Sequence, residues 1–161
     1  MTPRIAVAAV TFDRPKELSV LLDSIKAQSQ PVDTICLVDS GTTPAADVAA
    51  AHPNVDYVRS EANLGGAGGF ALAALKAVAS GARWIWMMDD DAEPADPECL
   101  ATLLREAEAR GLEAVVPLVT APGHPGRLSF SSASMARLRT TGLRWKSVAS
   151  FRTTATSSMV R

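Results

Sequence analysis

The chain has 161 residues, about the size of one domain, and 47% of them are apolar against 20% charged. This balance excludes a disordered chain and supplies enough apolar side chains for a core. Lysine and arginine (16) nearly balance aspartate and glutamate (17), so the formal net charge of −1 excludes recruitment of nucleic acid or an anionic membrane through bulk charge.

Short apolar runs, typical of strands buried on both faces, alternate along the chain with segments of helical periodicity. We predict strands at residues 4–10, 33–39, 55–60, 83–89 and 113–119. We predict helices at residues 15–29, at 45–51, in the second half of 61–81, and from an N-cap at Asp96 to about Arg110, before Gly111. The alternation predicts an α/β fold, with a mostly parallel sheet and helices on both of its faces.

The chain changes character after residue 119. The remainder is rich in Ser, Thr, Arg and Gly, with faint strand patterns at 128–131 and 147–151. We therefore divide the chain into residues 1–120 and 121–161, and we expect residues 147–161 to pack poorly.

Some conspicuous residues are predicted to take no part in chemistry. The cysteines fall in apolar segments at no metal-ligand spacing, which favours free buried thiols. The tryptophans alternate along a predicted strand and favour core packing, the histidines sit beside prolines in loops, and the arginine belongs at the surface. These residues are Cys36, Cys99, Trp84, Trp86, His52, His124 and Arg83.

Polar residues follow the predicted strands where each strand ends. In a parallel sheet the carboxyl ends of the strands lie at one edge, where ligands bind. The residues at these ends are Thr11, Phe12, Asp13, Asp39, Ser40, the loop 63–69 and residues 89–91. We expect them to converge on one crevice.

Three consecutive carboxylates, Asp89, Asp90 and Asp91, end the fourth predicted strand. If the segment stays extended, residues 89 and 91 project to one side and residue 90 to the other. Their mutual repulsion would be relieved by Mg²⁺ or Mn²⁺, which prefer oxygen ligands and keep phosphate oxygens in their shell. The alternative is a solvated acidic loop that favours the N-terminus of the next helix.

The glycine-rich segment has a rival interpretation. Residues 66–71, GAGGFA, fit the dinucleotide pattern G-x-G-x-x-A, and Asp89 follows after roughly 20 residues. The context fails, because polar residues separate the strand from the first glycine and the match falls on the third strand. The pattern G-x-x-x-x-G-K-[ST] does not occur, which excludes a P-loop nucleotide site.

Four stretches in this order, AVTFDRP, LVDSGT, NLGGAGGFA and WMMDDDAEP, resemble the nucleotide-sugar-binding half of family-two glycosyltransferases with the GT-A fold. The pair GGAGGF and DDD is most similar to the galactofuranosyltransferases that build the cell-wall galactan of mycolic-acid actinobacteria. The resemblance covers about residues 4–120. It implies a GT-A, Rossmann-like sheet.

The resemblance implies a nucleotide site at the first two strand ends. The uracil pocket would be lined by Thr11, Phe12, Asp13 and Arg14, and Asp39 would hydrogen-bond the base. Asp13 stands where the family usually has Asn.

It further implies a diphosphate and metal site at the other two strand ends. Asn63, Gly65 and Gly66 would cover the ribose and diphosphate. Asp89 and Asp91 would form the D-x-D pair that holds a divalent cation, Mg²⁺ or Mn²⁺, with Asp90 toward the ribose or the sugar.

The expected function is inverting transfer from a UDP-sugar, with galactofuranose favoured, to a glycan or lipid-linked glycan. Such transfer needs a general base, yet no Asp or Glu follows Glu113, so we identify no catalytic base. We expect residues 1–120 to be the donor-binding half and 121–161 the incomplete start of an acceptor half, in a truncated domain. The alternatives are a non-catalytic nucleotide-sugar-binding module and a nucleotidyltransferase.

The expected location is the cytoplasm, at the inner face of the plasma membrane if the acceptor is lipid-linked. No apolar run approaches the ~18 residues of a membrane span, and no charged-then-apolar leader precedes the first strand. Peripheral membrane association and oligomerisation stay open, and no nucleic-acid partner is expected.

Overall fold

The structure is a computed structural model and describes residues 4–121, 124–128, 150–152 and 158–160. Its larger sheet has the strand order β3-β2-β1-β4-β9-β5, and a smaller sheet has the order β7-β6-β8. The strands are β1 (Ile5–Thr11), β2 (Thr34–Asp39), β3 (Val55–Arg59), β4 (Trp84–Asp89), β5 (Ala114–Val115), β6 (Leu118–Ala121), β7 (His124–Leu128), β8 (Ser150–Arg152) and β9 (Ser158–Val160). The helices are α1 (Pro15–Lys26), α2 (Ala46–Ala50), α3 (Gly65–Ala79) and α4 (Cys99–Arg110).

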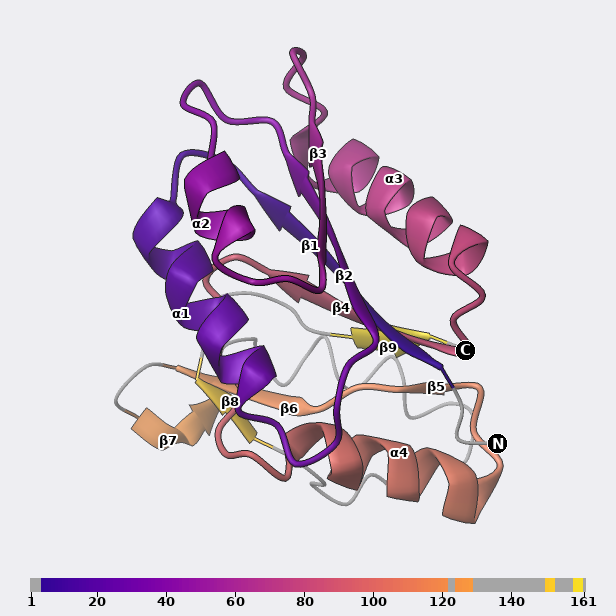
Figure 1. The fold of residues 1–161 in the computed structure, drawn as a ribbon. Coiled ribbons are helices and arrows are strands. Elements are labelled where there is room, and N and C mark those ends of the chain that lie inside the picture. The colour runs from indigo at the N-terminus through magenta and orange to yellow at the C-terminus, as the bar shows by residue number, and fades with distance from the viewer. Residues whose placement is uncertain (1–3, 122–123, 129–149, 153–157, 161) are drawn as a thin grey trace.

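The first four strands of the larger sheet are parallel, with β1 paired to both β2 and β4. Helices cover both faces, α1 and α2 on one and α3 on the other (Figure 1). The predicted parallel α/β sheet with helices on both faces is therefore confirmed. The chain runs outward from β1 through β2 to β3 and then returns to the other side of β1 as β4, which leaves a topological switch point between β1 and β4.

The two faces of the sheet carry different cores. On the side of α1 and α4, large side chains pack together, and both Trp84 and Trp86 are buried among them, as predicted. On the side of α3 the buried side chains are mostly small, among them Ala6, Ala8 and Ala73. Small side chains on both surfaces let α3 lie close to the sheet.

The first half of residues 61–81 was predicted as loop; this holds for residues 61–64 but is wrong from Gly65, where α3 begins. The Asn63 side-chain oxygen accepts a hydrogen bond from the Gly65 amide at 2.8 Å, which satisfies one donor at the helix start. A Cβ at Gly69 would lie 2.9 Å from Cγ1 of Val10 in β1. Gly69 thus serves the close packing of α3 on β1, although glycine is a poor helix former.

Two other predicted boundaries need correction. Helix α4 begins at Cys99 rather than directly after an N-cap at Asp96, because the Asp96 carboxylate and carbonyl accept from the amides of Glu98 and Cys99 in a turn. The predicted strand 113–119 is two short strands, β5 and β6, in different sheets. Pro117 lies between them, and proline cannot donate to a strand ladder.

Strand β9 inserts between β4 and β5 and runs antiparallel to both. Strand β8 pairs with β6 in the smaller sheet. The expectation that residues 147–161 pack poorly is therefore wrong for 150–152 and 158–160, whose backbones are paired. The other residues of that range, and most of the strand expected at 128–131, lie outside the described residues.

The residues predicted to be structural lie as expected where the structure describes them, except that His124, expected in a loop, begins strand β7. Cys36 and Cys99 are free and buried, and burial raises the pKa of the Cys99 thiol to about 12. Arg83 is exposed. His52 is buried, with its Nε2 atom 3.9 Å from Asp23 Oδ1.

Helix α3 spans 15 residues, and none of the helices in the described ranges is both long and apolar enough to cross a membrane.

Replacing Gly69 by alanine should destabilise the fold, because the new methyl group would meet the stiff, β-branched Val10 at 2.9 Å. Overpacking of this kind costs about 1–3 kcal/mol. Gly66→Ala is the matched control, since its Cβ would meet nothing within 4 Å in the same helix. Urea unfolding should place Gly69→Ala about 1–3 kcal/mol below Gly66→Ala. Equal stability of the two variants would show that α3 does not approach β1 this closely.

Candidate functional site

A cavity of about 350 Å³ lies at the carboxyl edge of the sheet, at the switch point between β1 and β4. This is where open parallel sheets bind ligands, because the loops diverge there and leave a crevice. The cavity is lined by Val10, Thr11, Phe12, Arg14, Ser40, Asn63, Gly65, Gly66, Asp89 and Asp90. Four segments distant in sequence, the ends of β1, β2 and β4 and the start of α3, thus meet at one place.

Asp90 is held at the wall of the cavity by the end of β1. Its Oδ2 atom accepts hydrogen bonds from the Thr11 hydroxyl at 2.8 Å and the Phe12 amide at 3.3 Å. Only 6% of the residue is exposed, and this burial raises the pKa of the Asp90 carboxyl, against the hydrogen bond from Thr11 and the other contacts that lower it. Val10 of β1 and Asp89 of β4 are register partners, so the residues that follow them, Thr11 and Asp90, lie at the same end of the two strands.

Arg14 bridges two carboxylates of the acidic triplet. Its Nη1 atom lies 3.3 Å from Asp90 Oδ1 and 2.9 Å from Asp91 Oδ2. The charges of these carboxylates raise the pKa of Arg14, with Asp90 the largest cause. The chain itself thus supplies a cation to the triplet.

The triplet does not stay extended, so the alternation expected for an extended segment, with residue 90 opposite residues 89 and 91, does not apply. Strand β4 ends at Asp89, and the Ala92 amide donates to the Asp89 carbonyl at 3.0 Å, which closes a turn. The turn directs the carboxylates of both Asp90 and Asp91 at Arg14. Strand geometry cannot be extended past the last paired residue.

Asp39 does not line the cavity. It is fully buried, and its Oδ1 atom accepts from the Gly41 amide at 2.9 Å and Arg59 Nη1 at 3.1 Å. Its Oδ2 atom accepts from the Ala45 amide at 2.8 Å and the Tyr57 hydroxyl at 2.7 Å. Four internal donors occupy this carboxylate, so that it anchors the loop after β2, of which Ser40 lines the cavity.

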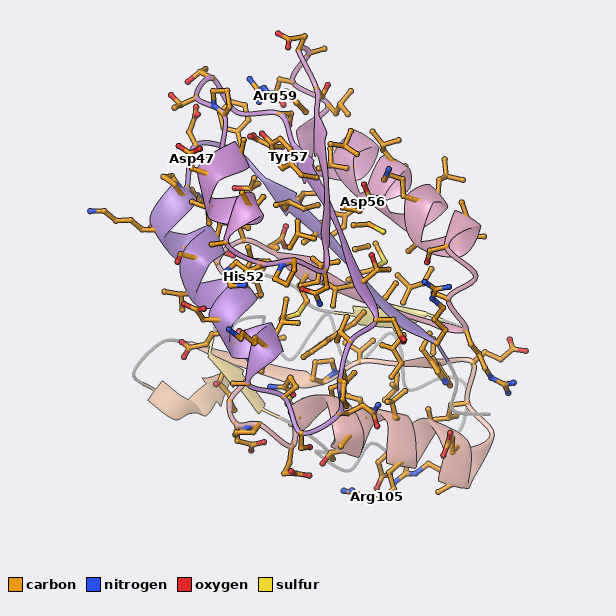
Figure 2. All side chains as sticks on the ribbon, viewed as in Figure 1. Asp47, His52, Asp56, Tyr57, Arg59 and Arg105 are labelled. Carbon is orange, nitrogen blue, oxygen red and sulfur yellow. The ribbon has the colours of Figure 1, made fainter. Side chains whose placement is uncertain are left out.

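Tyr57 and Arg59 were not predicted as part of this edge. Both lie on β3 at the same end of the sheet (Figure 2). They alternate along β3, and Arg59 is the register partner of Asp39. The sequence does contain a signal for them. Two polar side chains occupy alternate positions of one predicted strand, and the strand before it ends in Asp39.

Asp13 clamps the β1 loop to the β2 loop. Its carboxylate accepts from the amides of Thr42 at 2.7 Å and Thr43 at 2.9 Å, and from the Thr42 hydroxyl at 2.8 Å. The Thr43 bond is the first cause that lowers the pKa of Asp13. Its φ of 54° is left-handed, which Asn and Asp tolerate better than other residues with a side chain. A Cβ at Gly41 would lie 2.6 Å from the Asp13 amide nitrogen, so the loops meet closely.

The donor set at the end of β4 suits a hard divalent cation. Carboxylate oxygens are the preferred ligands of Mg²⁺, which needs only one or two of them when substrate phosphates supply the rest. Within the described part of the chain, no three His, Cys, Asp or Glu side chains are arranged to hold a metal ion. The Arg14 guanidinium forms ion pairs with Asp90 and Asp91, which shows that a positive charge can be held beside these carboxylates. The residues therefore fit a cation that a phosphate helps to bind.

The predicted site residues are thus divided. Eight line one cavity, namely Thr11, Phe12, Arg14, Asn63, Gly65, Gly66, Asp89 and Asp90. Asp91 contacts the cavity residue Arg14, and Asp13 and Asp39 support the loops behind it. Their roles toward a nucleotide or a metal stay predictions.

Comparison with known sequences supplies the family context. The family model described as Glycosyl transferase family 2 matches residues 6–161. Over 134 residues the chain is 42% identical to galactofuranosyltransferase GlfT1 of Mycobacterium tuberculosis, covering 81% of this chain and 44% of that protein. Over 131 residues it is 40% identical to galactofuranosyltransferase GlfT1 of Mycolicibacterium smegmatis, covering 80% and 43%. The chain spans less than half the length of these curated relatives.

Solved structures of S. aureus TarS share the fold. TarS 1–349 in complex with UDP-GlcNAc superposes with a TM-score of 0.66 at 17% identity, covering 80% of this chain and 37% of that chain. Its complex with UDP gives a TM-score of 0.63 at 19% identity, covering 80% and 38%. At such identities the likeness concerns the fold alone, and it confirms the expected GT-A architecture.

Tyr57 provides a spectroscopic test of the Asp39 network, because it is the single tyrosine of the chain. Burial and then the hydrogen bond to Asp39 raise the pKa of Tyr57 to about 12. A stopped-flow pH jump read at 295 nm should therefore ionise it near pH 12 in the folded chain and near pH ~10 in urea. The raised pKa favours the folded state below pH ~10, and this contribution is lost as the pH rises toward 12. Tyr57→Phe should lack this loss, and a folded midpoint near 10 would contradict the network.

Proposed function

The chain belongs to glycosyltransferase family 2, and we propose that its cavity binds the UDP part of a UDP-sugar, with UDP-galactofuranose the favoured donor, for inverting transfer to a glycan. The observation that carries the proposal is that the glycine start of α3, Asp89 and Asp90 of the acidic triplet, and the aromatic ring of Phe12 line one cavity. Support for the sugar comes from the mycobacterial galactofuranosyltransferases, which are 40–42% identical. Support for the nucleotide comes from TarS, a protein of the same fold solved with UDP and UDP-GlcNAc.

The base of the nucleotide would bind at the end of β1. Phe12 is 42% exposed although it is large and apolar, and it lies at the cavity wall. An exposed aromatic ring at a rim offers a planar base a stacking surface, which is worth about 1–3 kcal/mol per base in single-strand binding proteins. We assign Asp39 and Asp13 to the support of this pocket, because their carboxylates are occupied by internal donors.

The diphosphate would bind between the start of α3 and the acidic triplet. Gly65 and Gly66 line the cavity at the first turn of a helix of 15 residues, whose leading amides favour an anion. On the facing side, Asp89 and Asp91 would hold a Mg²⁺ or Mn²⁺ ion. Such an ion, when bound, supplies a Lewis acid that stabilises charge on the UDP leaving group. The chain's own contribution is to hold donor and leaving group in one orientation.

The acceptor belongs to the same proposal. We propose a glycan or lipid-linked glycan as acceptor, with residues 1–120 as the donor-binding half and 121–161 as the beginning of the acceptor half. No residue of this chain is assigned as the general base. A lipid-linked acceptor would bring the chain to the cytoplasmic face of a membrane without requiring a spanning helix.

Calorimetric titration of UDP with and without Mn²⁺ tests the proposal. UDP should bind only with Mn²⁺ present, and Asp91→Ala should weaken that binding by about tenfold or more, which is about 1.4 kcal/mol or more. Asp47→Ala, an exposed residue of α2 outside the cavity lining, is the control and should bind as the wild type does.

The same titration separates the alternative functions. Metal-independent UDP binding, or none, would refute a metal-assisted UDP-sugar site. Tighter binding of NAD than of UDP would favour a dinucleotide enzyme. A nucleoside triphosphate that binds more tightly than UDP would favour a nucleotidyltransferase.

A further inference from the structure

Arg14 is placed where it can meet two ligands of opposite kind. It lies in the loop between β1 and α1, with its side chain 52% exposed, and its Nη1 atom contacts both Asp90 and Asp91. The same residue lines the cavity beside Gly65 and Gly66. It therefore touches carboxylates on one side and faces the space of the proposed diphosphate on the other.

The negatively charged side chains at the cavity outnumber the positively charged ones. The triplet carries three carboxylates, and Arg14 is the one Lys or Arg among the residues that line the cavity in the described chain. One guanidinium leaves two negative charges, which a divalent cation would neutralise. A diphosphate that followed would then require a cation of its own.

We propose that Arg14 is an exchangeable counter-ion: it neutralises Asp90 and Asp91 until a divalent cation displaces it, and its guanidinium then binds the donor diphosphate. This inference rests on the proposed function, which supplies both the metal and the diphosphate. The exchange involves no covalent step and only changes which anion the guanidinium contacts.

The environment of the ion pair allows the exchange. The Arg14 side chain is 52% exposed, so water can replace the carboxylates around its guanidinium when it leaves, although Asp90 itself is buried. Asp90 would not be left bare, because the Thr11 hydroxyl and the Phe12 amide continue to donate to its Oδ2 atom. A planar guanidinium also pairs with two phosphate oxygens at once, which suits Arg better than Lys for the second role.

The two roles predict effects of opposite sign in one variant. Arg14→Gln removes the competitor of the metal, so Mn²⁺ alone should bind more tightly, by about tenfold or about 1.4 kcal/mol. The same variant lacks the cation for the diphosphate, so UDP in the presence of saturating Mn²⁺ should bind more weakly, by about tenfold. A purely structural residue would not improve either affinity when replaced.

The experiment measures Mn²⁺ binding by electron paramagnetic resonance of the unbound ion, and UDP binding by calorimetry, on the full 161-residue chain. Arg14→Lys keeps the charge without the planar fork and should bind Mn²⁺ as the wild type does while still losing UDP affinity. Arg83→Gln is the control, because Arg83 is exposed and absent from the cavity lining. It should leave both affinities unchanged.

Mn²⁺ affinity that is unchanged or lower in Arg14→Gln would overturn the exchange. Failure of Arg14→Gln to fold with Mn²⁺ present would overturn the exchange as well, because the proposal requires that the metal can take over the charge neutralisation that Arg14 provides. The Mn²⁺ arm needs no nucleotide, so the absence of UDP binding in every variant would refute the proposed function and not the competition between Arg14 and the metal.

Discussion

The hydrogen bonds that the end of β1 gives to Asp90 determine the shape of the candidate site. A carboxylate that is 6% exposed at the end of an apolar strand is costly unless donors reach it. Thr11, Phe12 and Arg14 are those donors, and all three belong to the segment that also forms the floor and rim of the cavity. Because β1 and β4 are adjacent and parallel, the hydrogen bonds to Asp90 connect the loops after these two strands at the switch point, where the topology opens a crevice. Removing it would loosen the cavity and the acidic triplet together.

A second layer of polar contacts stabilises the rim from behind. Asp13 accepts three hydrogen bonds from the loop that follows β2, and Asp39 accepts two from the same loop. Tyr57 and Arg59 extend this layer to β3. The cavity wall at Ser40 is therefore held by two carboxylates that do not line the cavity, the buried Asp39 and the exposed Asp13. Preorganised walls of this kind lower the ordering cost of binding a flexible ligand.

Much of this arrangement could be predicted from the sequence, for physical reasons. Apolar runs buried on both faces specify parallel strands, and parallel strands end at one edge, so the gathering of Thr11, Asn63, Gly65 and Asp89 follows from topology alone. The contacts that individual side chains make at that edge could not be predicted in the same way. The contacts of the Arg14 side chain depend on a turn after Asp89, and the close approach of α3 to Val10 depends on the missing side chain of Gly69. Tertiary contacts of this kind override local propensity, and a single sequence does not display them.

The central claim of the proposed function is that a divalent cation and a diphosphate bind together at the switch point between β1 and β4. An anomalous difference map from crystals of the chain grown with Mn²⁺ and UDP would test it most directly. The claim predicts one Mn²⁺ peak about 2.0–2.2 Å from a carboxylate oxygen of Asp89 or Asp91, with the UDP phosphates on the same ion and beside the start of α3. A Mn²⁺ peak away from the triplet, or a diphosphate bound outside the cavity, would contradict it.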